Sequence, residues 1–193
     1  MGRVVVAGAA GPSGQAVVRA LRAAGHDVVP VTRSEVDLSD AAAVAAYARE
    51  VSAAGPVDAL VHLVGGWRGG GGVAGQSDTD WEFLSERVID TLRHTSREFF
   101  AALAASGGRL IIVSTTGLAA PRAGNANYLA AKAAAEAWTQ ALGHELAKTG
   151  GGSDILRVLA LYSDADREAN PEKDFGAWTH VDVLGGRIVT ALA

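Results

Sequence analysis

The sequence predicts a three-layer α/β/α sandwich built on a doubly wound parallel sheet of about six strands. Short apolar runs rich in β-branched residues alternate with longer alanine-rich stretches along the whole chain. This alternation is typical of right-handed crossovers between parallel strands that are buried on both faces. The length of 193 residues fits one domain spanning 1–193, and 49% hydrophobic residues supply a sizeable core.

Strands are predicted where aliphatic residues run together and then stop at a glycine or a polar residue. The predicted strands are Arg3–Ala7, Asp27–Thr32, a short extended piece at Glu35–Leu38, Asp58–Val64, Arg109–Ser114 and Ile155–Leu161. Only Arg33 and Ser34 separate the second strand from the short extended piece, so no crossover helix is expected between them.

Helices are predicted where apolar residues recur at helical spacing between capping and terminating residues. They run over Ser13–Ala24, from a cap at Ser39 or Asp40 to about Ala54, over about Asp78–Ala105, over about Ala126–Lys148 and over Val181–Leu192. Gly65–Gly75 and Ser163–Trp178 are expected to be loops. No final edge strand follows the last helix, so the sheet is expected to be shortened at its C-terminal end.

Composition argues against several classes of partner. The net charge of -4, without a lysine or arginine block, disfavours nucleic acid and anionic membranes. The absence of cysteine excludes disulfides and thiolate metal sites, and the five scattered histidines show no paired ligand spacing, so no metal is expected. No signal peptide or membrane-spanning run is recognisable, and we expect a soluble, cytoplasmic protein.

A glycine-rich loop joins the first strand to the first helix. Gly8, Gly11 and Gly14 have the spacing GxxGxxG, with Pro12 and Ser13 among them. Small residues let the backbone approach a pyrophosphate, whose charge is stabilised at the N-terminus of the following helix. A tight turn would also use glycine, but the position between a strand and a helix favours dinucleotide binding.

The end of the second strand bears on which dinucleotide is bound. Arg33 beside Ser34 suits a ribose 2′-phosphate and therefore favours NADP. The acidic residues Glu35 and Asp37 would instead suit the free ribose hydroxyl of NAD, which stays open as the alternative.

Tyr128 and Lys132 lie four residues apart on the predicted long helix and therefore share one face. A nearby cation would lower the pKa of the phenol toward the working pH and make Tyr128 a suitable general acid. Such a pair is common by chance on helix surfaces. Lys132, however, is one of only three lysines and lies in a run of alanines that leaves room for a ligand.

Taken in order, these motifs resemble the short-chain dehydrogenase/reductase family over essentially the whole chain. The glycine-rich loop, LVGG at Leu63–Gly66, IIVST at Ile111–Thr115 and YxxxK carry the resemblance. It implies a Rossmann-like NAD(P)-binding domain with Tyr128 as proton donor and Lys132 on the nicotinamide ribose. The cofactor contacts expected from it are Gly8, Gly11, Pro12, Ser13, Gly14, Arg33, Ser34, Asp37, Leu38, Val64, Gly65, Gly66 and Lys132.

Two segments also resemble the dihydropteridine reductase branch of this family, namely GGWRGG at Gly65–Gly70 and NPEKDFGAW at Asn170–Trp178. The resemblance implies that both border the substrate pocket, where Trp67 or Trp178 could stack on a flat ring. The alternative is that both tryptophans only anchor their loops.

The chain departs from the family pattern at two catalytic positions. The position of the family's serine falls on Thr115, with Ser114 just before it, and either hydroxyl can donate to a substrate carbonyl. The family's middle-helix asparagine has no counterpart, since no asparagine lies between Trp67 and Gly124, and its place falls near Asp90.

Three functions are compatible with these residues. The first is an NAD(P)H-dependent oxidoreductase that transfers hydride to a small carbonyl, quinonoid or imine-like substrate. The others are a dinucleotide-binding sensor or scaffold without redox turnover, and a non-redox cyclase or dehydratase. Retention of both Tyr128 and Lys132 favours the oxidoreductase. The family's habit of pairing its two long helices predicts a homodimer or homotetramer.

Overall fold

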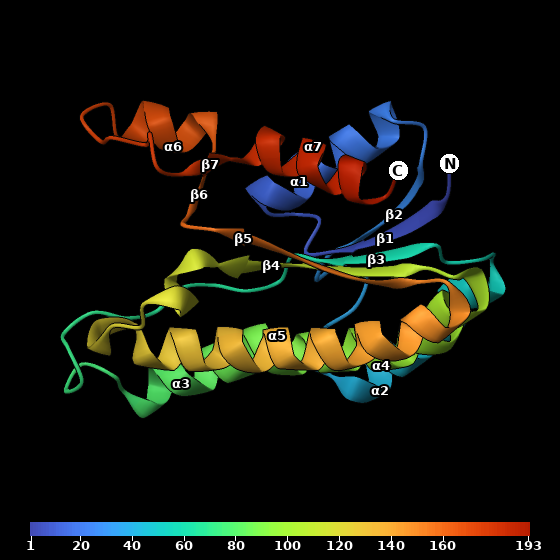
Figure 1. Cartoon of the computed structure of the whole chain (residues 1–193), viewed down its shortest axis with the longest axis horizontal. Helices are drawn as coiled ribbons and strands as arrows, with labels where there is room; N and C mark the ends of the chain where they lie inside the picture. Colours follow the sequence, from blue (N-terminus) through green and yellow to red (C-terminus); the bar gives the residue numbers. More distant parts are fainter.

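Five parallel strands form the central sheet of the computed structural model, which describes all 193 residues (Figure 1). In spatial order they are β2 (Asp27–Val31), β1 (Arg3–Ala7), β3 (Ala59–His62), β4 (Arg109–Thr115) and β5 (Gly152–Val158). The chain moves from β1 to β2 on one side and then returns to place β3 on the other side. The strand order thus reverses between β1 and β3, the position at which doubly wound sheets bind ligands.

Helices cover both faces of the sheet, which confirms the predicted three-layer α/β class (Figure 1). One face carries α1 (Pro12–Ala23) and α7 (Val181–Ala191), and the other carries α2 (Ala41–Ala53), α4 (Thr91–Ser106) and α5 (Ala126–Leu146). The cap predicted at Asp40 is present, since its carboxylate accepts from the amides of Ala42 and Ala43.

Alternate residues of each strand enter the two halves of the core. Leu110 and Ile112 of β4 pack with α4 and α5, whereas Ile111 packs with α1 and α7. Strands covered on both faces need apolar residues at consecutive positions, which explains the continuous aliphatic runs of the sequence.

Two expectations about local structure are wrong. Glu35–Leu38 forms turns rather than an extended piece, because the Glu35 carboxylate and the Ser34 hydroxyl hydrogen-bond back to Thr32; the central sheet therefore has five strands rather than about six. The predicted loop Ser163–Trp178 contains α6 (Asp164–Ala169), which a capping box between Ser163 and Asp166 begins.

A second sheet of two short strands flanks this segment. β6 (Leu161–Tyr162) pairs with β7 (Thr179–His180), so the residues after β5 leave the central sheet and α6 projects beside α7 (Figure 1). The loop predicted at Gly65–Gly75 is confirmed as free of helix and strand.

The helix predicted over about Asp78–Ala105 is present but changes its winding. It begins as α3 (Asp78–Leu84), continues as a π-helical segment at Ser85–Asp90 and ends as α4. Widened π-helical turns are frequent at functional sites. None of the helices is both long enough and apolar enough to cross a membrane.

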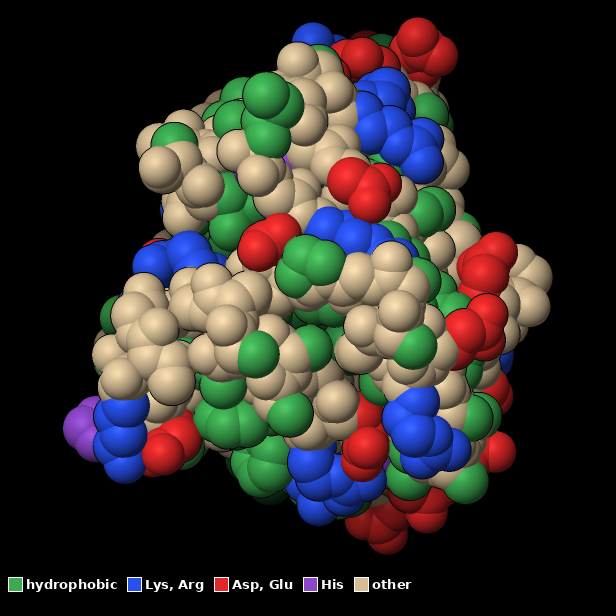
Figure 2. Space-filling view, turned by 90° about the vertical axis from the view of Figure 1, so that its right-hand side faces the viewer, with side chains coloured by type: hydrophobic (Ala, Val, Ile, Leu, Met, Phe, Trp, Pro, Cys, Tyr) green, Lys and Arg blue, Asp and Glu red, His purple; other side chains and the backbone are tan.

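The face at the amino ends of the strands mixes acidic and basic side chains without one dominant sign (Figure 2).

Candidate active site

Two cavities open at the carboxyl ends of the strands and share Val64 as a common wall. The larger has a volume of about 680 Å³ and the smaller about 200 Å³. The larger brings together the predicted residues Ser13, Gly65, Gly66, Trp67, Ser114, Thr115, Tyr128, Lys132 and Trp178. The smaller brings together Gly8, Gly11, Arg33, Asp37 and Leu38. Of the other predicted contacts, Pro12, Gly14 and Ser34 line neither cavity.

The three positions of the first loop differ in how strictly the backbone requires glycine there. Gly8 has a φ of +85°, which favours glycine, and a Cβ on Gly14 would lie 2.1 Å from the Gly8 carbonyl oxygen. Gly11 has a φ of -72°, and the nearest atom to its added Cβ is 3.8 Å away. The fold therefore requires Gly8 and Gly14 but leaves open space at Gly11.

This open space lies at the N-terminus of α1. Gly11 is the N-cap residue, no side chain caps the helix, and no acidic residue lies in its first turn. Unpaired amides at a helix N-terminus attract anions. A side chain at position 11 would fill the space, so the loop fits the close approach of a pyrophosphate.

Arg33 supplies an available cation at the smaller cavity. Its side chain is 70% exposed, and its nearest carboxylate oxygen, on Asp37, is 3.7 Å away. An exposed ion pair of this length holds the guanidinium weakly. Glu35 is held by Thr32, whose hydrogen bonds lower the pKa of the carboxyl, so it does not compete strongly for Arg33.

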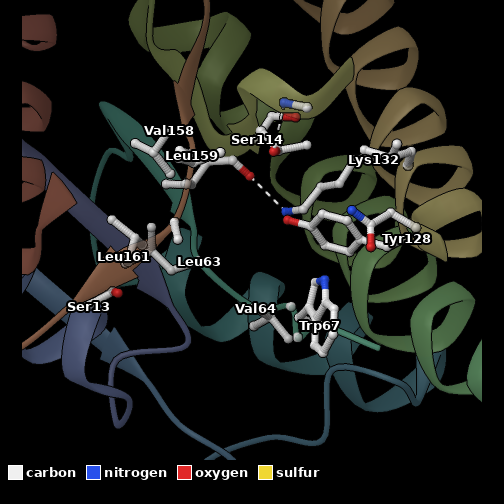
Figure 3. Close-up of a pocket in the computed structure, with 18 of the residues that line it drawn as sticks. Ser13, Leu63, Val64, Trp67, Ser114, Tyr128, Lys132, Val158, Leu159 and Leu161 are labelled. Atoms are coloured by element: carbon white, nitrogen blue, oxygen red, sulfur yellow. Dashed lines mark hydrogen bonds between the residues drawn. The ribbon is translucent and has the colours of Figure 1, made fainter. Parts of the chain in front are cut away.

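Tyr128 and Lys132 enter the larger cavity from α5, with Ser13 and Leu161 across from them (Figure 3). The Lys132 ammonium donates to the Val113 carbonyl oxygen at 2.9 Å and lies 5.9 Å from the centroid of the Tyr128 ring. Burial lowers the pKa of Lys132 to about 8, although the charge of Glu136 opposes this shift.

The expectation of a lowered pKa for Tyr128 is wrong for this arrangement. Burial of the phenol raises its pKa. Tyr128 therefore remains protonated at neutral pH, which is the state that a proton donor needs.

The two hydroxyls at the end of β4 differ in their partners. Ser114 is 2% exposed, and its Oγ makes no close hydrogen bond, although the hydroxyl is near enough to Glu136 to lower the pKa of that carboxyl. The Thr115 Oγ1 accepts from the Gly117 amide at 3.0 Å and begins a short 3₁₀ turn. Both residues line the larger cavity, and each hydroxyl still has its proton available to donate.

The two tryptophans at the larger cavity differ in how firmly they are held. Trp178 is half-buried, with Phe175 edge-on at 5.4 Å between ring centroids and the Lys173 ammonium 3.9 Å from its own centroid. Trp67 is 57% exposed. Packing contacts thus explain the position of Trp178. They do not explain why the large apolar side chain of Trp67 is exposed.

Sequence reasoning missed His62, which lines the larger cavity from β3. The imidazole lies between the hydroxyls of Thr91 and Thr95, at 3.2 and 3.1 Å. Burial and the charge of Lys132 lower the pKa of His62 to about 3, so the ring is neutral. A polar residue inside the apolar run Asp58–Val64 was the available signal.

Sequence reasoning also missed the ion pair between Glu136 and Arg157, although Glu136 is one helical turn from Lys132. Asp90, the position matched to the family's asparagine, lines neither cavity and pairs with Arg93 at 3.1 Å. No group of three or more His, Asp or Glu side chains is placed to hold a metal ion.

The family model for short-chain dehydrogenases matches residues 2–163. The chain is similar to the structure "ElxO with NADP Bound", with a TM-score of 0.85, 14% identity and coverage of 99% of this chain and 91% of that one. It is also similar to 3-ketoacyl-(acyl-carrier-protein) reductase from Brucella melitensis complexed with NADH, with a TM-score of 0.84, 20% identity and coverage of 99% and 90%. No curated protein matches the sequence.

The glycine geometry predicts a contrast between two substitutions. Gly14→Ala should destabilise the protein by about 1–3 kcal/mol, because its Cβ would overlap the Gly8 carbonyl. Gly11→Ala should fold with nearly unchanged stability yet bind NADPH at least about tenfold more weakly. Urea unfolding and calorimetric titration measure the two effects. Unchanged NADPH affinity in folded Gly11→Ala would show that no pyrophosphate lies against this loop.

Proposed function

Because the chain belongs to the short-chain dehydrogenase family, we propose that it is an NAD(P)H-dependent oxidoreductase. Its substrate would be a small carbonyl, quinonoid or imine-like compound. The observation that carries this proposal is the meeting of Tyr128, Lys132, Ser114 and Thr115 at one cavity, with a second cavity for a nucleotide beside it.

NADP is the proposed cofactor, with NAD as the alternative. The open loop at Gly11 fits a pyrophosphate, and Arg33 has an exposed guanidinium, only weakly paired with Asp37, for a 2′-phosphate. Asp37 and Leu38 line the same cavity and would contact the adenosine. Val64, Gly65 and Gly66 would lead the cofactor into the larger cavity. Solved structures of similar fold contain NADP or NADH, so the binding of both cofactors should be measured.

When bound, the dinucleotide would supply the hydride that reduces the substrate carbon. The Tyr128 phenol would give its proton to the oxygen or nitrogen that gains negative charge, since burial keeps this phenol protonated. Lys132 would turn from the Val113 carbonyl toward the ribose, and its charge would stabilise the tyrosinate left behind.

A hydroxyl at the end of β4 would polarise the substrate. Ser114 makes no close hydrogen bond that a substrate would have to replace, whereas Thr115 keeps its Gly117 contact while its own proton is donated. Either hydroxyl could donate to the reacting oxygen, since both residues line the cavity that Tyr128 also lines.

The wall opposite Tyr128 is apolar and suits a small, flat molecule. Leu159 and Leu161 line it, and Trp67 has an exposed indole face on which a ring could stack. Trp178 would close this wall from the segment that contains α6.

We also propose a homodimer or homotetramer. The outer face of α5 exposes a row of small residues, namely Ala130, Ala133, Ala134, Ala137 and Ala141, against which a second copy could pack. Light scattering at micromolar concentration would show a monomer if this is wrong. A cytoplasmic location remains our proposal.

Cofactor preference should depend on Arg33. Arg33→Ala should weaken NADPH binding roughly ten- to a hundredfold, because a charged contact to phosphate is lost, and should leave NADH binding almost unchanged. Arg22→Ala, at an exposed arginine outside both cavities, is the matched control. Equal weakening of NADPH and NADH by Arg33→Ala, or a native preference for NADH, would contradict the assignment.

Turnover should depend on the Tyr128 hydroxyl. In an NADPH oxidation assay against ketones, quinones and quinonoid dihydropterin, Tyr128→Phe should lower kcat by roughly 10²–10⁴ with little change in NADPH affinity. Tyr47→Phe, at a half-buried tyrosine of α2 outside both cavities, should keep full activity. Full activity in Tyr128→Phe would mean that the proton comes from another group. Absence of turnover in the native protein would favour a dinucleotide-binding role.

A further inference from the structure

An ion pair between the buried Glu136 and the half-exposed Arg157 lies one helical turn beyond Lys132, and the mechanism above does not use it. Glu136 of α5 is 8% exposed and accepts two hydrogen bonds from the guanidinium of Arg157 on β5. The Nε of Arg157 lies 2.9 Å from the Oε1 of Glu136, and its second nitrogen bonds Oε2. This fork geometry fixes both carboxylate oxygens.

The pair is a poor device for stability alone. Taking the Glu136 carboxylate out of water costs free energy, and its attraction to a half-exposed guanidinium recovers only part of it. Glu136 has the most buried carboxylate of the chain's ion pairs, with 10% of its side chain exposed against 54% for Glu145 in its pair with Lys148. A carboxylate fixed inside the protein beside the site therefore calls for a functional reason.

The register of the strands places the pair against the site. Arg157 is directly opposite Ser114 in the ladder between β4 and β5, and Ser114 lines the larger cavity. Lys132 bonds the carbonyl of Val113, the residue before Ser114. Helix α5 thus sets Lys132 and Glu136 in successive turns over the ends of these two strands.

We propose that Glu136, held by Arg157, is a positioning residue that keeps Lys132 in its ammonium form at neutral pH. This inference deepens the proposed function and rests on it for its biological purpose. A charged Lys132 is what a ribose contact and a tyrosinate both require, and Glu136 would supply the negative charge that retains the proton on Lys132.

The groups around Lys132 leave Glu136 as their only negative charge. From α5 come Tyr128, which burial keeps protonated, and Glu136; from β3 comes His62, neutral because its pKa is about 3. Ser114 of β4 is uncharged, and Arg157 of β5 is occupied by Glu136. Burial lowers the pKa of Lys132, and the charge of Glu136 raises it.

Glu136 itself stays ionised. Burial raises the pKa of its carboxyl, but hydrogen bonding by Arg157 and Ser114 and the charges of Arg157 and Lys132 outweigh burial, so the net shift of the pKa is downward. Without Arg157 this carboxylate would be a lone buried charge next to a lysine. The two hydrogen bonds from Arg157 hold the Glu136 carboxylate in its position beside Lys132.

The chain has only three lysines, so the side-chain resonance of Lys132 can be distinguished in a lysine-labelled sample. In protein labelled with ¹⁵N at lysine Nζ, the Lys132 resonance can be followed against pH without cofactor or substrate. Glu136→Gln should lower the titration midpoint of Lys132 by roughly one to two pH units, because one charge at the distance of a helical turn is removed. Glu145→Gln, on the same helix and paired with Lys148, is the matched control and should leave Lys132 unchanged.

Arg157→Gln separates this role from a purely structural one. It keeps the carboxylate beside Lys132 but no longer holds it in place, so the midpoint of Lys132 should fall less than in Glu136→Gln. Equal lowering by Arg157→Gln and Glu136→Gln would show that the pair only braces α5 against β5 and would overturn the proposal. An unchanged Lys132 midpoint in folded Glu136→Gln would overturn it as well.

Two further measurements complete the test. If Glu136→Gln does not fold, the double variant Glu136→Gln/Arg157→Gln removes both charges together and should still lower the Lys132 midpoint. In active protein, the alkaline limb of NADPH affinity should move to lower pH in Glu136→Gln. Because the lysine titration needs no turnover, a midpoint shift in a protein that reduces no substrate would refute the oxidoreductase and leave the Glu136 effect standing.

Discussion

The geometry of the site depends on how one ammonium group is held inside the protein. Lys132 donates to the Val113 carbonyl near the end of β4, and the buried face of α5 holds the helix against the sheet. Tyr128, one turn earlier, is thereby directed into the larger cavity, and Glu136, one turn later, meets Arg157 of β5. The proton donor Tyr128, the cation Lys132 and the carboxylate Glu136 thus lie on consecutive turns of α5.

The sheet determines where this helix can act. Reversal of strand order between β1 and β3 opens the space on either side of Val64, which links the cavity at Gly11 to the cavity at Tyr128. Gly8 and Gly14 allow β1 and α1 to pack closely, because neither has a side chain that would clash. Gly11 leaves space for a ligand at the junction between β1 and α1. A nucleotide and a small substrate can then meet at the carboxyl ends of β3 and β4.

Local sequence patterns predicted most of this arrangement, because strand runs, the Asp40 cap and the Tyr128 to Lys132 spacing each act over a few residues. The turn at Glu35 was missed because side-chain hydrogen bonds to Thr32 override an extended preference, and α6 was missed although Ser163 and Asp166 have capping-box spacing. The pKa of Tyr128 depends on burial, which spacing does not reveal. Glu136 and Arg157 are 21 residues apart and meet only when α5 packs on β5.

A crystal structure of the protein in complex with NADPH would test most directly whether the two cavities form one cofactor site. The 2′-phosphate should lie at Arg33, the pyrophosphate against Gly11 and the nicotinamide beside Tyr128, with Lys132 turned from the Val113 carbonyl to the ribose. A complex in which NADPH lies outside these cavities, or in which Lys132 makes no contact with the ribose, would contradict the site described above.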